Sequence, residues 1–413
     1  MHATVAVDPA TPDELPEAPT GGEPAVDRPW RRALKGAIVC YLVSRVGLLA
    51  MTCFTWFGEA NPGIHGPGAV FRIWTLQFDT RWFITIAAGG YPRNSTGAAH
   101  AAFFPLFPYV TRVVAPLFFF HYALAAMVVA NLALVAALMV LYRLTEHEFG
   151  VDSAGRAAFY LVAFPTGFFL STAYNEGTSI ALTAAAIYAM RRGHWWWAGV
   201  AGMFAATARS AGILLVGAFL FEYVRQNRRR VRLDALAGLL IPAGLGVVMF
   251  ADWYYYRDPL AFNHAQSRWG RQLTWPWKAI ADTIVHVVDP GRTRPLFGIT
   301  WAHDVLELGT VLLLLTMMVL MLVGPWKVRR DQFVLPLFGL ALITFMVSFP
   351  STFTNDIPNE LVSTSRIGLE VFPGFMMLGR LGQSRLLDRL LLVVFLPLQG
   401  MLVAQFLHGW WVA

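Results

Sequence analysis

Long apolar blocks and short polar segments follow one another along almost the whole chain. Each block runs for about 15 to 25 residues, the length of α-helix that crosses about 30 Å of hydrocarbon. The blocks are continuously apolar, whereas strands of a transmembrane barrel show apolar and polar residues in strict turn. The pattern therefore predicts an all-α, polytopic transmembrane bundle and excludes a barrel.

The composition agrees with a membrane protein. Of the 413 residues, 56% are hydrophobic and 14% are charged, whereas a soluble domain has about 25% charged residues. The formal net charge is +7, but the arginines lie in short runs between apolar blocks, where they report topology. We therefore expect no nucleic-acid partner. Cys40 and Cys53 would lie about 20 Å apart on one helix, too far apart for a disulfide.

Basic loops orient the chain, because short loops rich in arginine and lysine stay in the cytoplasm. We expect a disordered cytoplasmic tail over residues 1–35 and a single transmembrane domain over residues 36–413. The domain is predicted to have about eleven spans, with the N-terminus inside and the C-terminus outside. The basic clusters that set this orientation are residues 28–35, 191–192, 225–232, 327–330 and 380–389.

Two segments of the bundle are not ordinary spans. Residues 103–120 contain three prolines, and a crossing here would place the basic pair 191–192 outside. We expect this segment to lie along the outer interface or to re-enter. Residues 195–224 have room for two short helices that meet near Arg209 and Ser210, and half-length helices in membranes usually line a cavity. The other expected spans are residues 36–57, 122–142, 157–173, 178–190, 233–255, 305–323, 333–349, 367–381 and 390–411.

This topology sends the polar segments that are not basic loops to one face. They belong to three outer loops, residues 58–120, 256–304 and 350–366. Cytoplasmic connections are short and leave little room for a nucleotide-binding domain, so chemistry is expected on the extracytoplasmic face, without ATP or nucleotide sugars. The polar stretches that converge there are residues 79–91, 174–176, Arg209, 257–304 and 351–366.

Two acidic residues are candidates for the chemistry. Asp79 is a candidate general base, because a carboxylate at the mouth of a low-dielectric cavity can accept a hydroxyl proton; the alternative is an interfacial cap paired with Arg81. Glu176 is either a second catalytic acid or a stabiliser of a helix N-terminus, worth about 0.3 to 1 kcal/mol. A divalent cation shared by these two carboxylates stays open. We predict no metal site, because no His/Asp/Glu cluster has ligand spacing.

Basic and aromatic side chains near the outer face are candidates for substrate binding. An arginine fork matches phosphate oxygens, so a lipid phosphate is the natural ligand. The alternatives are headgroup contacts, or an Arg366–Glu370 pair one helical turn apart. Tryptophans could stack on a sugar, although they also mark every membrane interface. The candidate binding residues are Arg81, Trp82, Arg209, His264, Gln266, Arg268, Trp269, Arg271 and Arg366.

Several motifs together resemble a known family. They are FDTRWFITIAAGGYP and AAFFPLFPYVTR in the first outer loop, AFPTGFFLSTAYNEGTS and the residues after it, and the later AFNHAQSRWGR and TSRIGLEVFPGF. In this order they resemble the bacterial branch of the PIG-V type (GPI mannosyltransferase 2-like) membrane mannosyltransferases, over most of the chain after residue 35. The resemblance implies a GT-C glycosyltransferase fold whose first outer loop carries the catalytic acid.

The resemblance also implies an activity. It points to an inverting enzyme of the cell envelope that moves a sugar, expected to be mannose, from a polyprenyl-phosphate carrier to an extracytoplasmic lipid or glycan acceptor. It maps Asp79 as the base and Glu176 as a second outer acidic position. The main rival is a transporter or flippase for a lipid-linked sugar; such proteins commonly show internal repeats and midplane sites, and no repeat is seen here. A non-catalytic scaffold leaves the outer acids and arginines unexplained.

Overall fold

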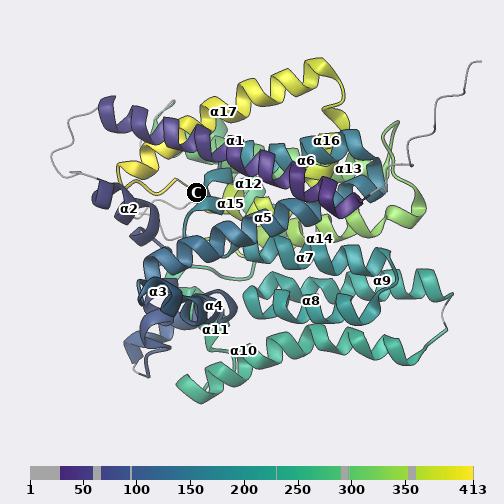
Figure 1. Cartoon of the computed structure of the whole chain (residues 1–413), viewed down its shortest axis with the longest axis horizontal. Helices are drawn as coiled ribbons and strands as arrows, with labels where there is room; N and C mark the ends of the chain where they lie inside the picture. The colour runs from purple at the N-terminus through teal and green to yellow at the C-terminus, as the bar shows by residue number, and fades with distance from the viewer. Residues whose placement is uncertain are drawn as a thin grey trace, which may run out of the picture.

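The computed structural model describes residues 28–58, 67–93, 95–228, 230–289, 296, 298–351 and 360–412 of the chain. Helices make up most of this part of the chain (Figure 1), which confirms the predicted all-α bundle. Among the described residues, six helical segments have the length and apolar composition of a complete span. They are α1 (Pro29–Gly58), α5 (Tyr122–Phe149), η5 (Leu233–Leu239) continued by α10 (Leu240–Tyr256), α13 (Ile299–Leu322), η7 (Arg330–Gln332) continued by α14 (Val334–Val347), and α17 (Arg385–Leu407).

The other five expected spans are shorter helices. Eight of the ten residues of α16 are buried, so protein surrounds this helix. Neighbouring protein can satisfy the polar groups at the ends of such a helix, which then need not reach both membrane surfaces. The expected count of about eleven thus resolves, within the described ranges, into six helices with the length and composition of a complete span and five shorter helices. The shorter ones are α6 (Val151–Ala163), α7 (Glu176–Arg191), α8 (Trp195–Ala208), α9 (Leu215–Asn227) and α16 (Phe372–Leu381).

The first helix begins earlier than expected. Residues 1–27 of the predicted tail lie outside the described residues, but α1 starts at Pro29, so residues 29–35 are helical rather than disordered. Proline is favoured in the first turn of a helix. Arg32 forms an ion pair with Glu146 of α5, and Ala33 is fully buried, so this first turn is held by tertiary contacts.

The break predicted near Arg209 and Ser210 is confirmed. The helix α8 ends at Ala208, Arg209 is extended with φ −159° and ψ 145°, and the short turn η4 (Ser210–Leu214) leads into α9. A Cβ atom on Gly212 would lie 2.4 Å from a backbone atom of Ala205, so only glycine allows η4 to pack this closely on α8. The joint therefore has a fixed position in the bundle.

Short helices gather at one end of the bundle, on the left in Figure 1. They include α2 (Pro67–Leu76), α3 (Thr80–Gly89), α4 (Leu106–Val114) and α11 (Ala261–His264). Residues 103–120 form no span, because α4 is followed only by the turn η2 (Ala115–Phe118). Phe107 on α4 is buried, while Val113 and Leu117 are exposed, as in a helix that lies along an interface. Short helices are thus present in the predicted first outer loop, and their place at a membrane interface stays a prediction.

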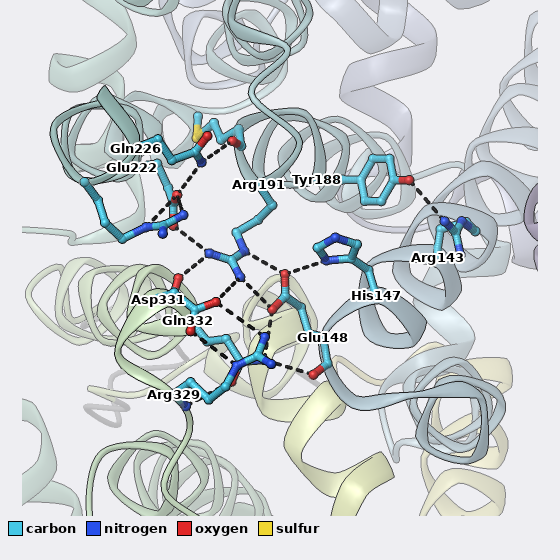
Figure 2. Close-up of polar contacts among 12 residues, drawn as sticks. Arg143, His147, Glu148, Tyr188, Arg191, Glu222, Gln226, Arg329, Asp331 and Gln332 are labelled. Atoms are coloured by element: carbon cyan, nitrogen blue, oxygen red, sulfur yellow. Dashed lines mark hydrogen bonds and ion pairs between the residues drawn. The ribbon is translucent and has the colours of Figure 1, made fainter. Parts of the chain in front are cut away.

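A buried ion-pair network joins several helices at the C-terminal end of α7 (Figure 2). The guanidinium of Arg191, the last residue of α7, donates two hydrogen bonds to the carboxylate of Glu148 on α5, at 2.6 and 2.9 Å. It also contacts Glu222 of α9 at 3.2 Å and Asp331 of η7 at 3.1 Å. The side chains of Glu148 and Glu222 are fully buried, so the network fixes four elements relative to one another.

Candidate active site

A cavity of about 950 Å³ lies where the polar segments predicted to be outer meet. All five polar stretches that the sequence predicted to converge contribute to its wall. They arrive on α3, on the start of α7, on the α8–η4 joint, on η6 (Ala265–Trp269) with the residues after it, and on α15 (Thr364–Ile367) with the residues before it. The predicted site residues in the wall are Asp79, Arg81, Trp82, Glu176, Arg209, Gln266, Trp269, Arg271 and Arg366.

Two predicted binding residues do not reach the cavity. His264 is exposed and its Nδ1 atom lies 2.7 Å from Oδ2 of Asp258, and Arg268 is also exposed. The reason is the turn η6, in which residues three apart share a face. This spacing brings Gln266 and Trp269 to the cavity and leaves Arg268 outside.

Asp79 is paired with Arg366, not with Arg81. Nη1 of Arg366 donates a hydrogen bond of 2.9 Å to Oδ2 of Asp79, whereas Nε of Arg81 donates to the carbonyl oxygen of Leu76 at 2.6 Å. Asp79 precedes α3 but makes no capping bond, so its carboxylate is not used by the helix. Its side chain is 23% exposed, and that of Arg366 6%. One carboxylate is thus oriented by a buried arginine and still open to the cavity.

Alternating charges continue from this pair into the protein. Nε of Arg366 lies 3.5 Å from Oε1 of Glu176, the same oxygen lies 3.3 Å from Nη1 of Arg209, and that nitrogen lies 2.6 Å from Oε1 of Glu370. Burial alone would lower the pKa of Arg366, but the carboxylates of Asp79 and Glu176 outweigh it and raise the pKa. Arg366 therefore stays charged. The alternative of an Arg366–Glu370 pair is not observed, because the chain turns through η8 (Gly368–Glu370) and Glu370 pairs with Arg209 instead.

Glu176 is the first residue of α7, as predicted for a helix N-terminus, and its side chain is 1% exposed. Its contacts are with Arg209 and Arg366, which places it among the charged groups of the wall. Within the described ranges, no three His, Cys, Asp or Glu side chains are grouped so that they could hold a metal ion.

Arg271 is a largely buried cation in the wall that has no carboxylate partner among the described residues, whereas Arg81, which also lacks one, is exposed. Of the described carboxylates, none lies within ion-pair distance of the Arg271 guanidinium, and its Nε is buried without a hydrogen-bond partner. Burial and the positive charges of Arg366 and Arg209 lower the pKa of Arg271 to about 10, so it is still protonated at neutral pH. A positive charge that is neither exposed nor paired is a binding point for an anion.

A second, smaller cavity of about 270 Å³ adjoins the first at Arg209, Gln266 and Arg271. Most of its wall away from this junction is apolar. The apolar side chains come mainly from α14, with others from α10 and η4, and they include Ile213, Leu245, Leu342, Phe345, Met346 and Phe349. The two arginines therefore stand between a polar cavity and an apolar one.

Aromatic rings form another part of the wall. Trp82 stacks on Phe103, with ring centroids 5.5 Å apart and planes 14° apart, and Trp269 meets both rings edge-on. Trp275 and Trp277 are exposed and stack on each other, outside the cavity. Trp82 and Trp269 thus line the cavity, whereas Trp275 and Trp277 do not.

Two residues near the Asp79–Arg366 pair have left-handed backbone conformations that are unusual for non-glycine residues. Phe78, directly before Asp79, has φ 53°, and Ser363, three residues before Arg366, has φ 69°. Such conformations cost about 1 to 3 kcal/mol each and cluster at functional sites. Sequence reasoning missed Phe78 and Trp411 as parts of the wall, and the backbone conformation of Phe78 leaves no signal in the sequence.

Comparison with solved structures shows the fold. The chain is similar to the oligosaccharyltransferase of Archaeoglobus fulgidus in its apo form, with 10% identity and a TM-score of 0.50, over 92% of this chain and 56% of that one. It is also similar to ArnT from Cupriavidus metallidurans bound to undecaprenyl phosphate, with 15% identity and a TM-score of 0.48, over 82% of this chain and 60% of that one. The chain thus spans less than two thirds of either structure.

Curated protein sequences include no match to this chain. The model of one family, glycosyltransferase family 87, does match, over residues 107–352. The matched range includes Glu176, Arg209 and Arg271 and leaves out Asp79 and Arg366. The expected GT-C type bundle and the expected class of membrane glycosyltransferase are thus confirmed, while the narrower likeness to PIG-V type enzymes stays a prediction. The match covers more than half of the chain, which belongs to glycosyltransferase family 87.

Proposed function

We propose that this protein transfers a sugar, mannose in the first instance, from a polyprenyl-phosphate carrier to an extracytoplasmic lipid or glycan acceptor, with inversion at the anomeric carbon. The observation that carries the proposal is the arrangement of the two cavities. A carboxylate open to the polar cavity faces the same space as a guanidinium without a carboxylate, and that guanidinium borders an apolar cavity. A lipid-linked sugar has matching parts: an apolar chain, a phosphate and a sugar.

The donor is expected to lie across the junction. Its isoprenoid chain contacts the apolar cavity beside α14, and its phosphate binds Arg271, with Arg209 as a second cation that is partly neutralised by Glu370. The sugar then enters the polar cavity, where Trp82 and Trp269 offer ring faces and edges. Arginine suits this role, because its planar fork binds phosphate oxygens with two parallel hydrogen bonds.

Asp79 is proposed as the general base. Its carboxylate accepts the proton of an acceptor hydroxyl as that oxygen bonds to the anomeric carbon, from the face opposite the phosphate. The bond between the anomeric carbon and the phosphate oxygen breaks in the same step, and the electron pair leaves with the polyprenyl phosphate. Arg366 holds the carboxylate in place at 2.9 Å. Fixed cations near the leaving phosphate stabilise the charge that develops there.

Transfer assays with the full-length protein in lipid nanodiscs test the donor class. We expect wild-type protein to move label from polyprenyl-phosphate [¹⁴C]mannose to a lipid or glycan extract, and not from a nucleotide sugar. Arg271→Gln should raise KM for this donor about 10- to 100-fold, as expected for a lost charge-assisted contact, because its guanidinium is the free cation at the junction. The matched control is Arg268→Gln, which is exposed and outside the cavity.

The outcomes of this assay separate the alternatives. If the protein transfers no sugar from any polyprenyl-phosphate donor but moves the intact lipid-linked sugar between leaflets, it is a flippase and not a transferase. Equal KM values for the Arg271 variant and its control would remove this arginine from the phosphate site.

The orientation in the membrane is a separate proposal. The cavity lies at the start of α7, whereas the basic residues Arg225 and Arg228 lie at the end of α9, which contacts the other end of α7, so the positive-inside rule predicts that the cavity is outside. In a variant without Cys40 and Cys53, we expect His264→Cys to react with an impermeant thiol reagent in intact cells and Arg228→Cys to react only after lysis. Both positions are exposed in the folded protein. The opposite labelling would show that the site faces the cytoplasm.

A further inference from the structure

Arg366 stands on a segment that cannot hold itself in place. The helix α15 has four residues, and it begins after Ser363, whose φ is 69°. A single turn of helix is unstable alone, because nucleation fixes several residues for one hydrogen bond. Yet the guanidinium of Arg366 lies 2.9 Å from Asp79 and is flanked by the rings of Phe169, Tyr174 and Trp411. Contacts from elsewhere must therefore fix this segment.

Glu307 supplies these contacts from the span α13. Its carboxylate accepts hydrogen bonds from Oγ1 of Thr364 at 2.7 Å, from Oγ of Ser365 at 3.0 Å and from the backbone N–H of Ser365. These donors lie in the first turn of α15, where backbone N–H groups have no partner within the helix. Thr166 completes the attachment by donating to the carbonyl oxygen of Ser365 at 2.8 Å.

Glu307 is 2% exposed and lies outside both cavities, so it contacts no substrate held in them. A buried carboxylate without hydrogen bonds is strongly destabilised, and here the groups that satisfy it belong to one short segment. We infer that Glu307 is a positioning residue: it fixes Thr364 and Ser365, and through them Arg366 and the carboxylate of Asp79. This inference rests on the proposed role of Asp79 as the base.

Two substitutions separate position from charge. Glutamine can keep the hydrogen bonds, since its oxygen can accept from Thr364 and the Ser365 N–H while its amide donates to the Ser365 hydroxyl. Leucine has a similar volume but cannot accept a hydrogen bond. We expect Glu307→Leu to lower kcat about 100-fold, the cost of a small misplacement of a catalytic group, with KM for the donor within about twofold. Glu307→Gln should keep kcat within about fivefold of wild type.

Controls and a second variant accompany these measurements. Thr310→Val alters a buried polar residue one turn further along α13 and should keep wild-type kcat. If Glu307→Leu does not fold, the double variant Thr364→Val, Ser365→Ala removes both side-chain donors and should show the same loss of kcat. In an Arg366→Lys background, Glu307→Leu should lower kcat by less than about a further twofold, because Glu307 acts on kcat through Arg366.

A structural measurement separates this inference from the proposed function. A cryo-electron microscopy structure of Glu307→Leu should show the Arg366–Asp79 hydrogen bond, 2.9 Å in the wild type, broken. If wild-type protein transfers no sugar, the proposed function fails, and this bond still decides the inference. An intact bond in the leucine variant, or equal kcat losses for leucine and glutamine, would overturn the positioning role.

Discussion

Asp79→Asn is expected to fold and insert like the wild type and to lose sugar transfer almost completely. Removal of a general base lowers the rate about 100- to 10,000-fold, because an amide cannot take the proton of the attacking hydroxyl. The fold should tolerate the change, since the Asp79 side chain caps no helix and the amide oxygen of an asparagine can still accept a hydrogen bond from Arg366. The measurement is kcat with polyprenyl-phosphate mannose for the purified variant.

The control for this experiment is Asp258→Asn, because Asp258 is an acidic residue of the predicted large outer loop that pairs with His264 outside the cavity. Its hydrogen bond from His264 lowers the pKa of Asp258, so it resembles Asp79 in being a carboxylate with a basic partner. It should keep wild-type kcat. Turnover of Asp79→Asn equal to that of this control would exclude Asp79 as the base.

Arg191→Leu should have the largest effect on stability. The substitution leaves Glu148 and Glu222 buried without their shared cation, although Gln332 still donates to Glu148 and Arg225 still pairs with Glu222. Breaking a buried ion pair by removing one partner costs about 3 to 5 kcal/mol. We expect this loss in the free energy of unfolding, measured by thermal denaturation in detergent micelles and visible as a lower Tm.

The next residue gives the matched comparison. Arg192 is exposed, so Arg192→Leu should change stability by less than about 0.5 kcal/mol. Both variants should keep the wild-type kcat per folded molecule, because the network (Figure 2) surrounds Arg191, the last residue of α7, whereas Glu176 in the cavity wall is the first. A Tm for Arg191→Leu equal to that of Arg192→Leu would show that the network contributes nothing to stability.

Features set by chain length and local composition could be predicted from the sequence. The break at Arg209 followed from a count, since residues 195–224 are too short for two full spans, and the structure has two short helices there. The meeting of Asp79, Glu176 and Arg271 in one cavity followed from topology, because basic loops leave the polar segments at one face.

Pairings across the bundle could not be predicted in this way. Sequence spacing suggested Asp79–Arg81 and Arg366–Glu370, but the chain pairs Asp79 with Arg366 and Arg209 with Glu370. Each true partner lies more than 150 positions away in the sequence, as the separations of 287 and 161 show. The role of Glu307 could not be predicted either, because it is one of several polar residues in α13 and its contacts with α15 are visible only in the structure.

The length of α7 sets the depth of the reaction. Its 16 residues span about 24 Å, which is about 6 Å less than the hydrocarbon layer. In the proposed orientation, with Arg191 at the inner boundary of that layer, Glu176 and the floor of the cavity would lie below the level of the outer lipid headgroups. The proposed reaction would then favour acceptors anchored in the outer leaflet, or slender glycan ends, over folded proteins.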